Sequence, residues 1–189
     1  MLGARPPEEP SPHACEFDAV YEQQFELVWR TLRRLGVARS ALDDALQDVF
    51  LVVHRRLPEF EQRSSIRTWI FGITLRVASD YLRRGRRLQA TTSDIEQRDE
   101  LRDEAALDPL EQRARNEAVA LLYAALAELD PDKRAAFVLA ELEEMTLPEV
   151  ALAVGANVHT VASRVKAGRR QFEAALRRLR AKDDWRSRP

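Results

Sequence analysis

The chain has 189 residues, of which 45% are hydrophobic and 32% are charged. This composition predicts one large or two small folded domains with a well-solvated surface. No run approaches the roughly 18–20 apolar residues of a membrane span, so we expect no membrane insertion. The single cysteine, Cys15, excludes an intrachain disulfide framework and a cysteine-based metal site. Residues 1–15 lack a signal-peptide pattern and are predicted to be a disordered, proline-rich tail, which makes the cytoplasm the expected compartment.

The net charge of −1 conceals alternating basic and acidic segments. Residues 21–88 carry a net charge of +5, residues 89–117 carry −5, and residues 156–182 carry +7. Two basic segments separated by an acidic connector favour two contacts on one polyanion. Charge alone leaves open the alternative that these segments are ordinary solvated helix faces in an arginine-rich chain.

The first part of the chain has helical periodicity. Apolar residues at steps of three and four predict helices over residues 17–35, 40–57 and 66–84. We expect Gly36 to end the first helix and Ser40 to cap the second, which Pro58 then stops. The third helix is predicted to end near Gly85. A loop over residues 59–65 connects the second and third helices.

The second part of the chain is also helical in pattern. Helices are predicted over residues 119–129, 131–142, 147–154 and 158–181. Asp130 is the expected N-cap of the second of these, and Thr146 with Glu149 forms the capping-box pattern of the third. Gly155 is expected to end that short helix, and Asn157 to cap the last one.

The residues between the two helical parts lack a sustained apolar stripe and are acidic and polar. We therefore predict an all-α fold with two small helical domains joined by a flexible acidic linker. The predicted domains are residues 16–87 and 113–182, the linker is 88–112, and a C-terminal tail is 183–189.

The stretch from 147 to 172 has the pattern of a helix-turn-helix. On a helical wheel the packing face of the last helix holds Val161, Val165, Gly168, Phe172, Leu176 and Leu179. The opposite face holds His159, Ser163, Lys166 and Arg170, with Thr160 and Ala167 at its edge. Small polar residues at the start of a recognition helix allow close approach to base edges, and cations further along meet phosphates. An ordinary helical hairpin with a basic surface is the alternative.

The second predicted helix has an exposed apolar spot. Leu51 lies on the face opposite the buried stripe, among Asp44, Gln47, Asp48 and Arg55. An apolar centre with a charged rim is typical of a docking surface. One exposed leucine is also normal on any protein, so an uninvolved surface residue is the alternative.

The third predicted helix is apolar on nearly all sides and is surrounded by arginines. Arg67, Arg76 and Arg83 accompany several aromatic and aliphatic residues. Aromatic rings among arginines suit single-stranded nucleic acid, because cations follow the phosphates and rings stack with unstacked bases. The alternative is a central core helix, in which Trp69 is a core residue.

A resemblance to the extracytoplasmic-function sigma factors of bacterial RNA polymerase rests on three segments in order: DDALQDVFLVVHRRLPEF, RTWIFGITLRVASDYLRR, and, after the acidic linker, LDPDKRAAFVLAELEEMTLPEVALAVGANVHTVASRV. It covers about residues 17–180. The resemblance implies that the first domain is sigma region 2 and the second is sigma region 4. The chain would then direct core polymerase to promoters and help to open the −10 region. The implied partners are core RNA polymerase, through the largest-subunit clamp helices and the flap, promoter DNA and an anti-sigma factor. No cofactor is implied, and the protein would be cytoplasmic and nucleoid-associated.

The resemblance also implies three sets of site residues. Core polymerase would contact Asp44, Gln47, Asp48, Leu51 and Arg55. The −10 strand would contact Phe60, Arg63, Ser64, Ser65, Arg67, Arg76 and Arg83. The −35 duplex would contact His159, Thr160, Ser163, Arg164, Lys166, Ala167 and Arg170. The loop from 60 to 66 would capture a flipped base, for which Phe60 is either a pocket wall or only a loop anchor packed on Trp69.

Four positions depart from the common pattern of the family. Many members have basic residues at the positions of Ala162 and Ala167, a glycine at His159, and an arginine at Gly72. These departures leave the promoter sequence open.

Two other classes of function are alternatives. One is a stand-alone helix-turn-helix regulator that does not depend on polymerase. The other is an all-α enzyme, which the scattered histidines argue against, because His13, His54 and His159 have no metal-ligand spacing. We therefore expect no catalytic residue and no metal site.

Overall fold

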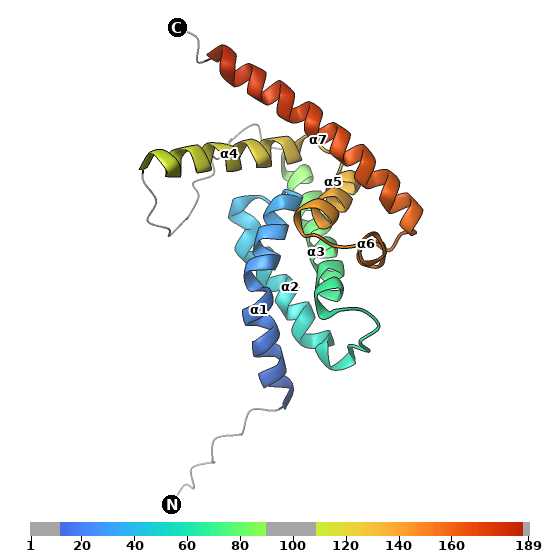
Figure 1. Ribbon diagram of the computed structural model, residues 1–189. Helices are drawn as coiled ribbons and strands as arrows, with labels where there is room; N and C mark the ends of the chain where they lie inside the picture. The colour runs from blue at the N-terminus through green and yellow to red at the C-terminus, as the bar shows by residue number, and fades with distance from the viewer. Residues whose placement is uncertain (1–11, 90–108, 187–189) are drawn as a thin grey trace, which may run out of the picture.

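The computed structural model describes residues 12–89 and 109–186, which are helical throughout apart from short connections (Figure 1). The α-helices are α1 (Pro12–Leu35), α2 (Leu42–Arg56), α3 (Ile66–Gln89), α4 (Pro109–Ala127), α5 (Pro131–Phe137), α6 (Leu147–Val154) and α7 (Val158–Arg186). Two 3₁₀ turns, η1 (Arg39–Ala41) and η2 (Leu57–Glu59), flank α2, and a π-helix, η3 (Val138–Leu142), continues α5. The predicted all-α fold is confirmed within these residues.

Helices α1, α2 and α3 pack into a bundle that forms the first half of the molecule. Its core consists of the buried residues Val28, Leu32, Leu35, Val37, Leu42, Ala45, Leu46, Val49, Phe50, Val53, Ile70, Ile73 and Ala78. Gly36 ends α1 with a φ of 98°, as predicted. Three boundary predictions for this half are wrong: α1 begins at Pro12, inside the predicted tail, Ser40 lies in η1 and does not cap α2, and α3 continues through Gly85 to Gln89. The helix tolerates Gly85 because the low helix propensity of a single glycine is outweighed by the helix-forming residues around it.

Helices α4 to α7 form the second half, in which α7 packs on α5 and α4 (Figure 1). Helix α4 begins at Pro109 and not at residue 119, so residues 109–112 of the predicted linker are helical. Close packing of α7 on α5 depends on Gly168. A Cβ atom at this position would lie 3.0 Å from the Lys133 carbonyl oxygen and 3.1 Å from Phe137 Cβ. Asp130 precedes Pro131 at the start of α5, but its side chain makes no capping bond. Instead it accepts hydrogen bonds from Lys133 and Gln171, which hold the pKa of this carboxyl below its ordinary value.

The turn between α6 and α7 has the local structure that its sequence predicts. The Thr146 and Glu149 side chains form the capping box of α6. Gly155 ends α6 in the left-handed conformation with φ 65°, which costs glycine little. Asn157 then accepts a hydrogen bond of 2.8 Å from the Thr160 backbone N–H and caps α7.

The two halves pack directly on each other, mainly through α3 and α6. A Cβ atom at Gly72 would lie 3.5 Å from the Ala153 carbonyl oxygen, an ordinary contact distance, so α3 and α6 lie close together at this point. Phe71 of α3 is 1% exposed and belongs to the apolar cluster that includes Leu139, Val150 and Val161 of the second half. Arg134 of α5 adds a hydrogen bond of 3.0 Å to the Leu35 carbonyl, and burial lowers the pKa of its guanidinium.

Candidate polymerase and nucleic-acid interfaces

Helix α2 presents Leu51 to solvent at 45% exposure, opposite its buried stripe. Asp44, Gln47 and Arg55 are also exposed. The structure therefore brings the predicted apolar centre and most of its polar rim together on one surface. We call Asp44, Gln47, Leu51 and Arg55 the α2 docking face.

Asp48, the fifth predicted contact of this face, has a role inside the fold. Its carboxylate is half-buried and accepts a hydrogen bond of 2.8 Å from the Tyr81 hydroxyl of α3. Burial and the Asp48 hydrogen bond raise the pKa of Tyr81 to about 12. A charge reversal at Asp48 would therefore disturb the packing of α2 on α3 as well as the docking face.

An aromatic groove of about 630 Å³ borders the α2 docking face. Its lining is Phe17, Tyr21, Phe25, Asp43, Leu46, Gln47, Phe50, Leu51 and His54. The Tyr21 and Phe50 ring centroids are 4.6 Å apart. The groove was not predicted from the sequence, although the α1 aromatics Phe17, Tyr21 and Phe25 are spaced by four residues and so lie on one face of the helix.

The loop between η2 and α3 is ordered by its own side chains. Phe60 packs on Trp69, with ring centroids 5.1 Å apart, so the expected anchoring contact is present. Ser65 caps α3, because its hydroxyl accepts a hydrogen bond of 3.1 Å from the Thr68 N–H. Ser64 donates a hydrogen bond to the adjacent Ser65 carbonyl, and the exposed Arg63 pairs with Glu61.

The three candidate arginines of α3 have different surroundings. Arg76 is exposed on the surface of the helix. Arg83 forms an exposed ion pair of 2.6 Å with Asp80. Arg67 instead reaches the second half and donates a hydrogen bond of 2.6 Å to the Glu143 backbone carbonyl.

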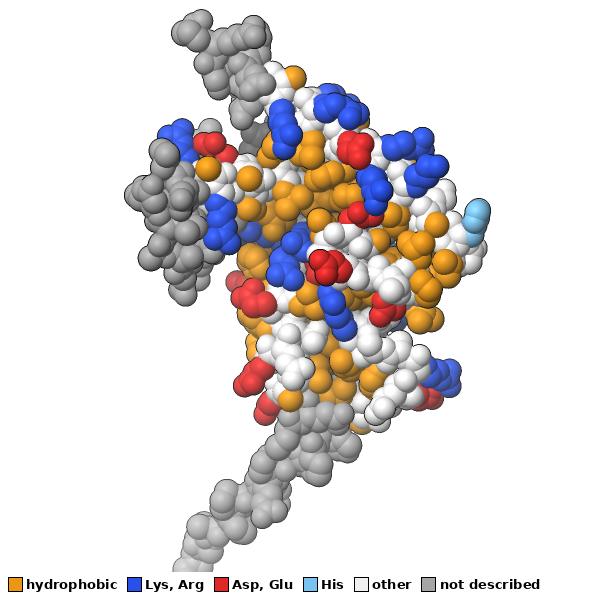
Figure 2. Space-filling model, in the orientation of Figure 1, with side chains coloured by type: hydrophobic (Ala, Val, Ile, Leu, Met, Phe, Trp, Pro, Cys, Tyr) orange, Lys and Arg blue, Asp and Glu red, His pale blue; other side chains and the backbone are white. Residues whose placement is uncertain are grey.

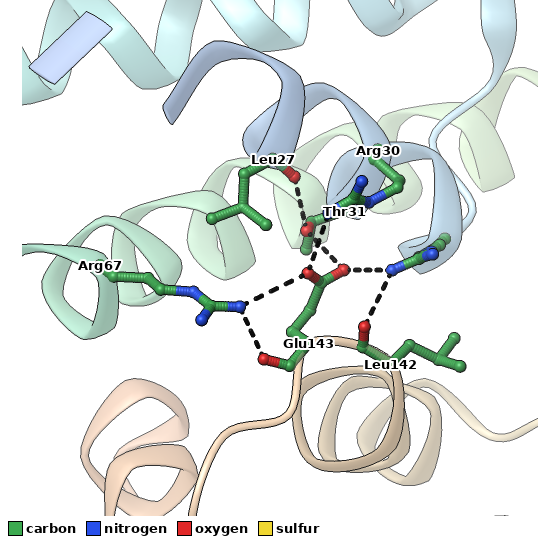
Figure 3. Close-up of polar contacts among 7 residues, drawn as sticks. Leu27, Arg30, Thr31, Arg67, Leu142 and Glu143 are labelled. Atoms are coloured by element: carbon green, nitrogen blue, oxygen red, sulfur yellow. Dashed lines mark hydrogen bonds and ion pairs between the residues drawn. The ribbon is translucent and has the colours of Figure 1, made fainter. Parts of the chain in front are cut away.

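Glu143 lies at the centre of a cluster between the two halves (Figure 3). Its side chain is 1% exposed, and its Oε1 atom lies 2.6 Å from Arg34 Nη1 and 3.1 Å from the Thr31 hydroxyl. Its Oε2 atom lies 3.7 Å from Arg30 and 3.9 Å from Arg67. The sequence analysis missed this residue because an acidic pair at positions 143 and 144 gives no sign of which member is buried.

The polar face of α7 is open to solvent in its first turns. His159, Ser163, Lys166 and Arg170 are exposed, and Thr160 and Ala167 are half-buried at the edge. Arg164, predicted to contact DNA, is half-buried and forms an ion pair of 2.6 Å with Asp132 of α5. This ion pair holds the Arg164 side chain against α5.

Basic side chains continue along the outer surface of α7. Figure 2 shows Lys and Arg gathered at the upper right edge of the molecule, where α7 runs in Figure 1. Arg169 pairs with Glu141 at 2.6 Å, whereas Lys166 and Arg170 point from the face that carries Ser163. A helix with a small polar start and cations further along fits the major groove of duplex DNA.

Comparison with known families assigns both halves. The family model for Sigma-70 region 2 matches residues 20–88, and the one for Sigma-70, region 4 matches residues 120–172. The ECF RNA polymerase sigma factor SigC of Mycobacterium tuberculosis is 32% identical over 142 residues, which cover 75% of this chain and 73% of the relative. The chain belongs to the extracytoplasmic-function (ECF) sigma factors. It is therefore an RNA polymerase sigma factor and a transcription initiation factor.

Other ECF sigma factors extend the comparison. The RNA polymerase sigma factor NccH of Alcaligenes xylosoxydans xylosoxydans is 31% identical over 163 residues, which cover 85% of this chain and 86% of the relative. The fold is similar to that of the sigma factor RpoE in its complex with the anti-sigma factor NepR from Bartonella quintana. That match has a TM-score of 0.67 at 18% identity and covers 86% of this chain and 97% of the other.

Among residues 12–89 and 109–186, no group of three or more His, Cys, Asp or Glu side chains is placed to hold a metal ion. In the same part of the chain, no helix combines the length and the apolar character that crossing a membrane requires.

Proposed function

We propose that this sigma factor docks on core RNA polymerase through its first half and reads two promoter elements. In this proposal α7 reads the −35 element as duplex, and the first half opens and holds the −10 element. The observation that carries it is the pair of exposed surfaces of different chemistry on one chain: the apolar-centred α2 docking face and the basic polar face of α7.

The first half supplies the polymerase contact and the single-strand contact. Leu51 is the apolar centre that the clamp helices of the largest subunit would cover, with Asp44 and Arg55 on the charged rim. Arg63, Arg67, Arg76 and Arg83, with Ser64, Ser65 and Phe60, would line the path of the melted strand. Phe60 contributes by holding the loop on Trp69.

The second half supplies the duplex contact. His159, Thr160 and Ser163 occupy the first turns of α7, where a recognition helix approaches base edges, and Ala167 leaves room beside them. Lys166 and Arg170 would contact phosphates. Arg164 would act indirectly, since its ion pair with Asp132 orients α7 on α5.

The remaining assignments follow from the same function. We assign residues 16–87 to region 2, 88–112 to the linker and 113–182 to region 4. The partners are core polymerase (clamp helices and flap), promoter DNA and an anti-sigma factor, the last supported by the similar fold of RpoE bound to NepR. The protein would act in the cytoplasm on the nucleoid and would have no catalytic activity.

Run-off transcription tests the function. Core polymerase is incubated with a genomic promoter library, with and without this protein, and the transcripts are sequenced. We expect new start sites that share upstream elements only when the protein is present. The stand-alone regulator predicts instead sequence-specific duplex binding without polymerase and no new starts, and that outcome would replace the proposal.

A further inference from the structure

Three arginines of the first half converge on one point that the second half fills. Arg30 and Arg34 extend from α1 and Arg67 from α3, and the Thr31 hydroxyl lies beside them (Figure 3). We call these four residues the arginine site. All of them belong to the first half, so the site is complete without the second half except for its occupant, Glu143.

The second half is shaped to deliver that occupant. The π-helix η3 ends at Leu142, and the N–H of the next residue, Glu143, bonds back to the Val138 carbonyl at 3.0 Å. The next residue, Glu144, has a φ of 54°, which is uncommon for a residue with a side chain. Single π-turns and left-handed residues of this kind occur often at functional positions. They turn the Glu143 carboxylate toward α1 and leave Glu144 exposed.

The chemistry of the arginine site suits a phosphate at least as well as a carboxylate. Guanidinium groups bind both anions through paired N–H donors, and a phosphodiester, like a carboxylate, offers two equivalent oxygens and one negative charge. Three guanidinium groups around one carboxylate also leave an excess of positive charge. Glu143 Oε2 and the Arg67 Nε–H are both buried without a hydrogen bond, so the carboxylate and the guanidinium groups do not satisfy each other completely.

The location of the arginine site points to single-stranded DNA as the source of that phosphate. Arg67 lies in the first turn of α3, two residues after Ser65 and next to the loop that Phe60 anchors on Trp69. According to the proposed function, the melted strand passes this loop. Its backbone would then reach the arginine site only after Glu143 has left.

We propose that the arginine site binds a phosphate of the melted promoter strand, and that Glu143 occupies it as a phosphate mimic while the two halves are packed together. Arg30 and Arg34 thereby join Arg67 as strand contacts, an assignment that rests on the proposed function. The packed arrangement and the single strand compete for one site. Separation of the halves therefore raises the affinity for single-stranded DNA.

The competition is measured by fluorescence anisotropy of the full-length chain with a fluorescein-labelled 12-nucleotide poly-dT strand. Glu143→Gln removes the competing charge and keeps the side-chain volume. We expect Glu143→Gln to bind the strand about fivefold more tightly than the wild type. The gain arises because most wild-type molecules are in the packed arrangement, in which Glu143 occupies the arginine site. Glu144→Gln makes the same charge change at the exposed neighbour and is the matched control, with the wild-type affinity expected.

A second pair of variants opens the halves without changing any charge. Gly72→Gln places a long neutral side chain against the Ala153 backbone, whereas Gly72→Ala adds only a methyl group that makes ordinary contact there. We expect tighter strand binding for Gly72→Gln and little change for Gly72→Ala. Both substitutions favour the helix, so α3 should remain folded, which circular dichroism verifies.

Arg34→Ala in the Glu143→Gln background decides whether the arginine site itself holds the strand. We expect this double variant to lose the gained affinity. If folded Glu143→Gln and Gly72→Gln bind the strand no better than the wild type, or if the loss of Arg34 leaves the gain intact, the inference is wrong. A gain seen only with duplex poly-dA·dT would also overturn it. Run-off transcription by the wild type tests the proposed function separately from these outcomes.

Discussion

A glutamate in place of Leu51 should separate polymerase binding from folding. The leucine is 45% exposed, so docking would bury the remaining part of a side chain whose full burial is worth about 1.5–3 kcal/mol. Loss of that burial costs roughly 1 kcal/mol. A carboxylate forced into the desolvated centre of the interface adds about 2 kcal/mol or more.

The total of about 3 kcal/mol corresponds to roughly a 100-fold weaker Kd for core polymerase. The chain is labelled at its single cysteine, Cys15, and titrated with core polymerase in the absence of DNA. Asp48 is left unchanged, because its carboxylate binds the Tyr81 hydroxyl and a substitution there would disturb the fold. The Leu51→Glu variant should retain the helical circular dichroism of the wild type, since the side chain faces solvent.

Ala19→Glu is the matched control for this experiment. It adds the same charge to the same half at an exposed position of α1, and Ala19 is not part of the aromatic groove beside Leu51. We expect its Kd to equal that of the wild type. If Leu51→Glu also binds core polymerase within about threefold of the wild type, a loss below 1 kcal/mol, the α2 docking face is wrongly placed.

Three further predictions concern the second half and α3. Thr146→Ala should lower the free energy of unfolding by about 1 kcal/mol in urea titrations through loss of the capping box. Hydrogen bonds from Thr146 hold the pKa of Glu149 below its ordinary value, so this stabilisation should be present above about pH 4.3 and lost as the pH falls through the lowered pKa. Gly168→Ala should destabilise by about 1–3 kcal/mol, less a helix gain of up to about 1 kcal/mol, because its Cβ would press on the Lys133 carbonyl oxygen and on Phe137. Gly85→Ala, which meets no neighbour within 4 Å, should stabilise by up to about 1 kcal/mol. Lys166→Ala should reduce the salt dependence of −35 duplex binding by about one unit of slope, and an unchanged slope would remove Lys166 from the phosphate contacts.

Local features of the chain were predictable because they depend on neighbours in the sequence. The capping box of Thr146 and Glu149, the left-handed Gly155 and the cap at Asn157 all act within four residues. The exposure of Leu51 followed from the helical period, which places it opposite a buried stripe. Even here the cap at Ser40 failed, because a 3₁₀ turn precedes α2.

Contacts between distant segments were decided only by the tertiary structure. Arg67 and Asp48 were predicted from one helix each to face a partner, yet Arg67 meets Glu143, 76 residues away, and Asp48 meets Tyr81. Side-chain periodicity gives the direction in which a residue points around its own helix but not which helix lies there. The sequence by itself therefore determined which segments are helical, the caps of α6 and α7, and the family. The packing of α6 on α3, and with it the burial of Glu143 among three arginines, was decided by the tertiary fold, since it depends on the shapes of both halves together.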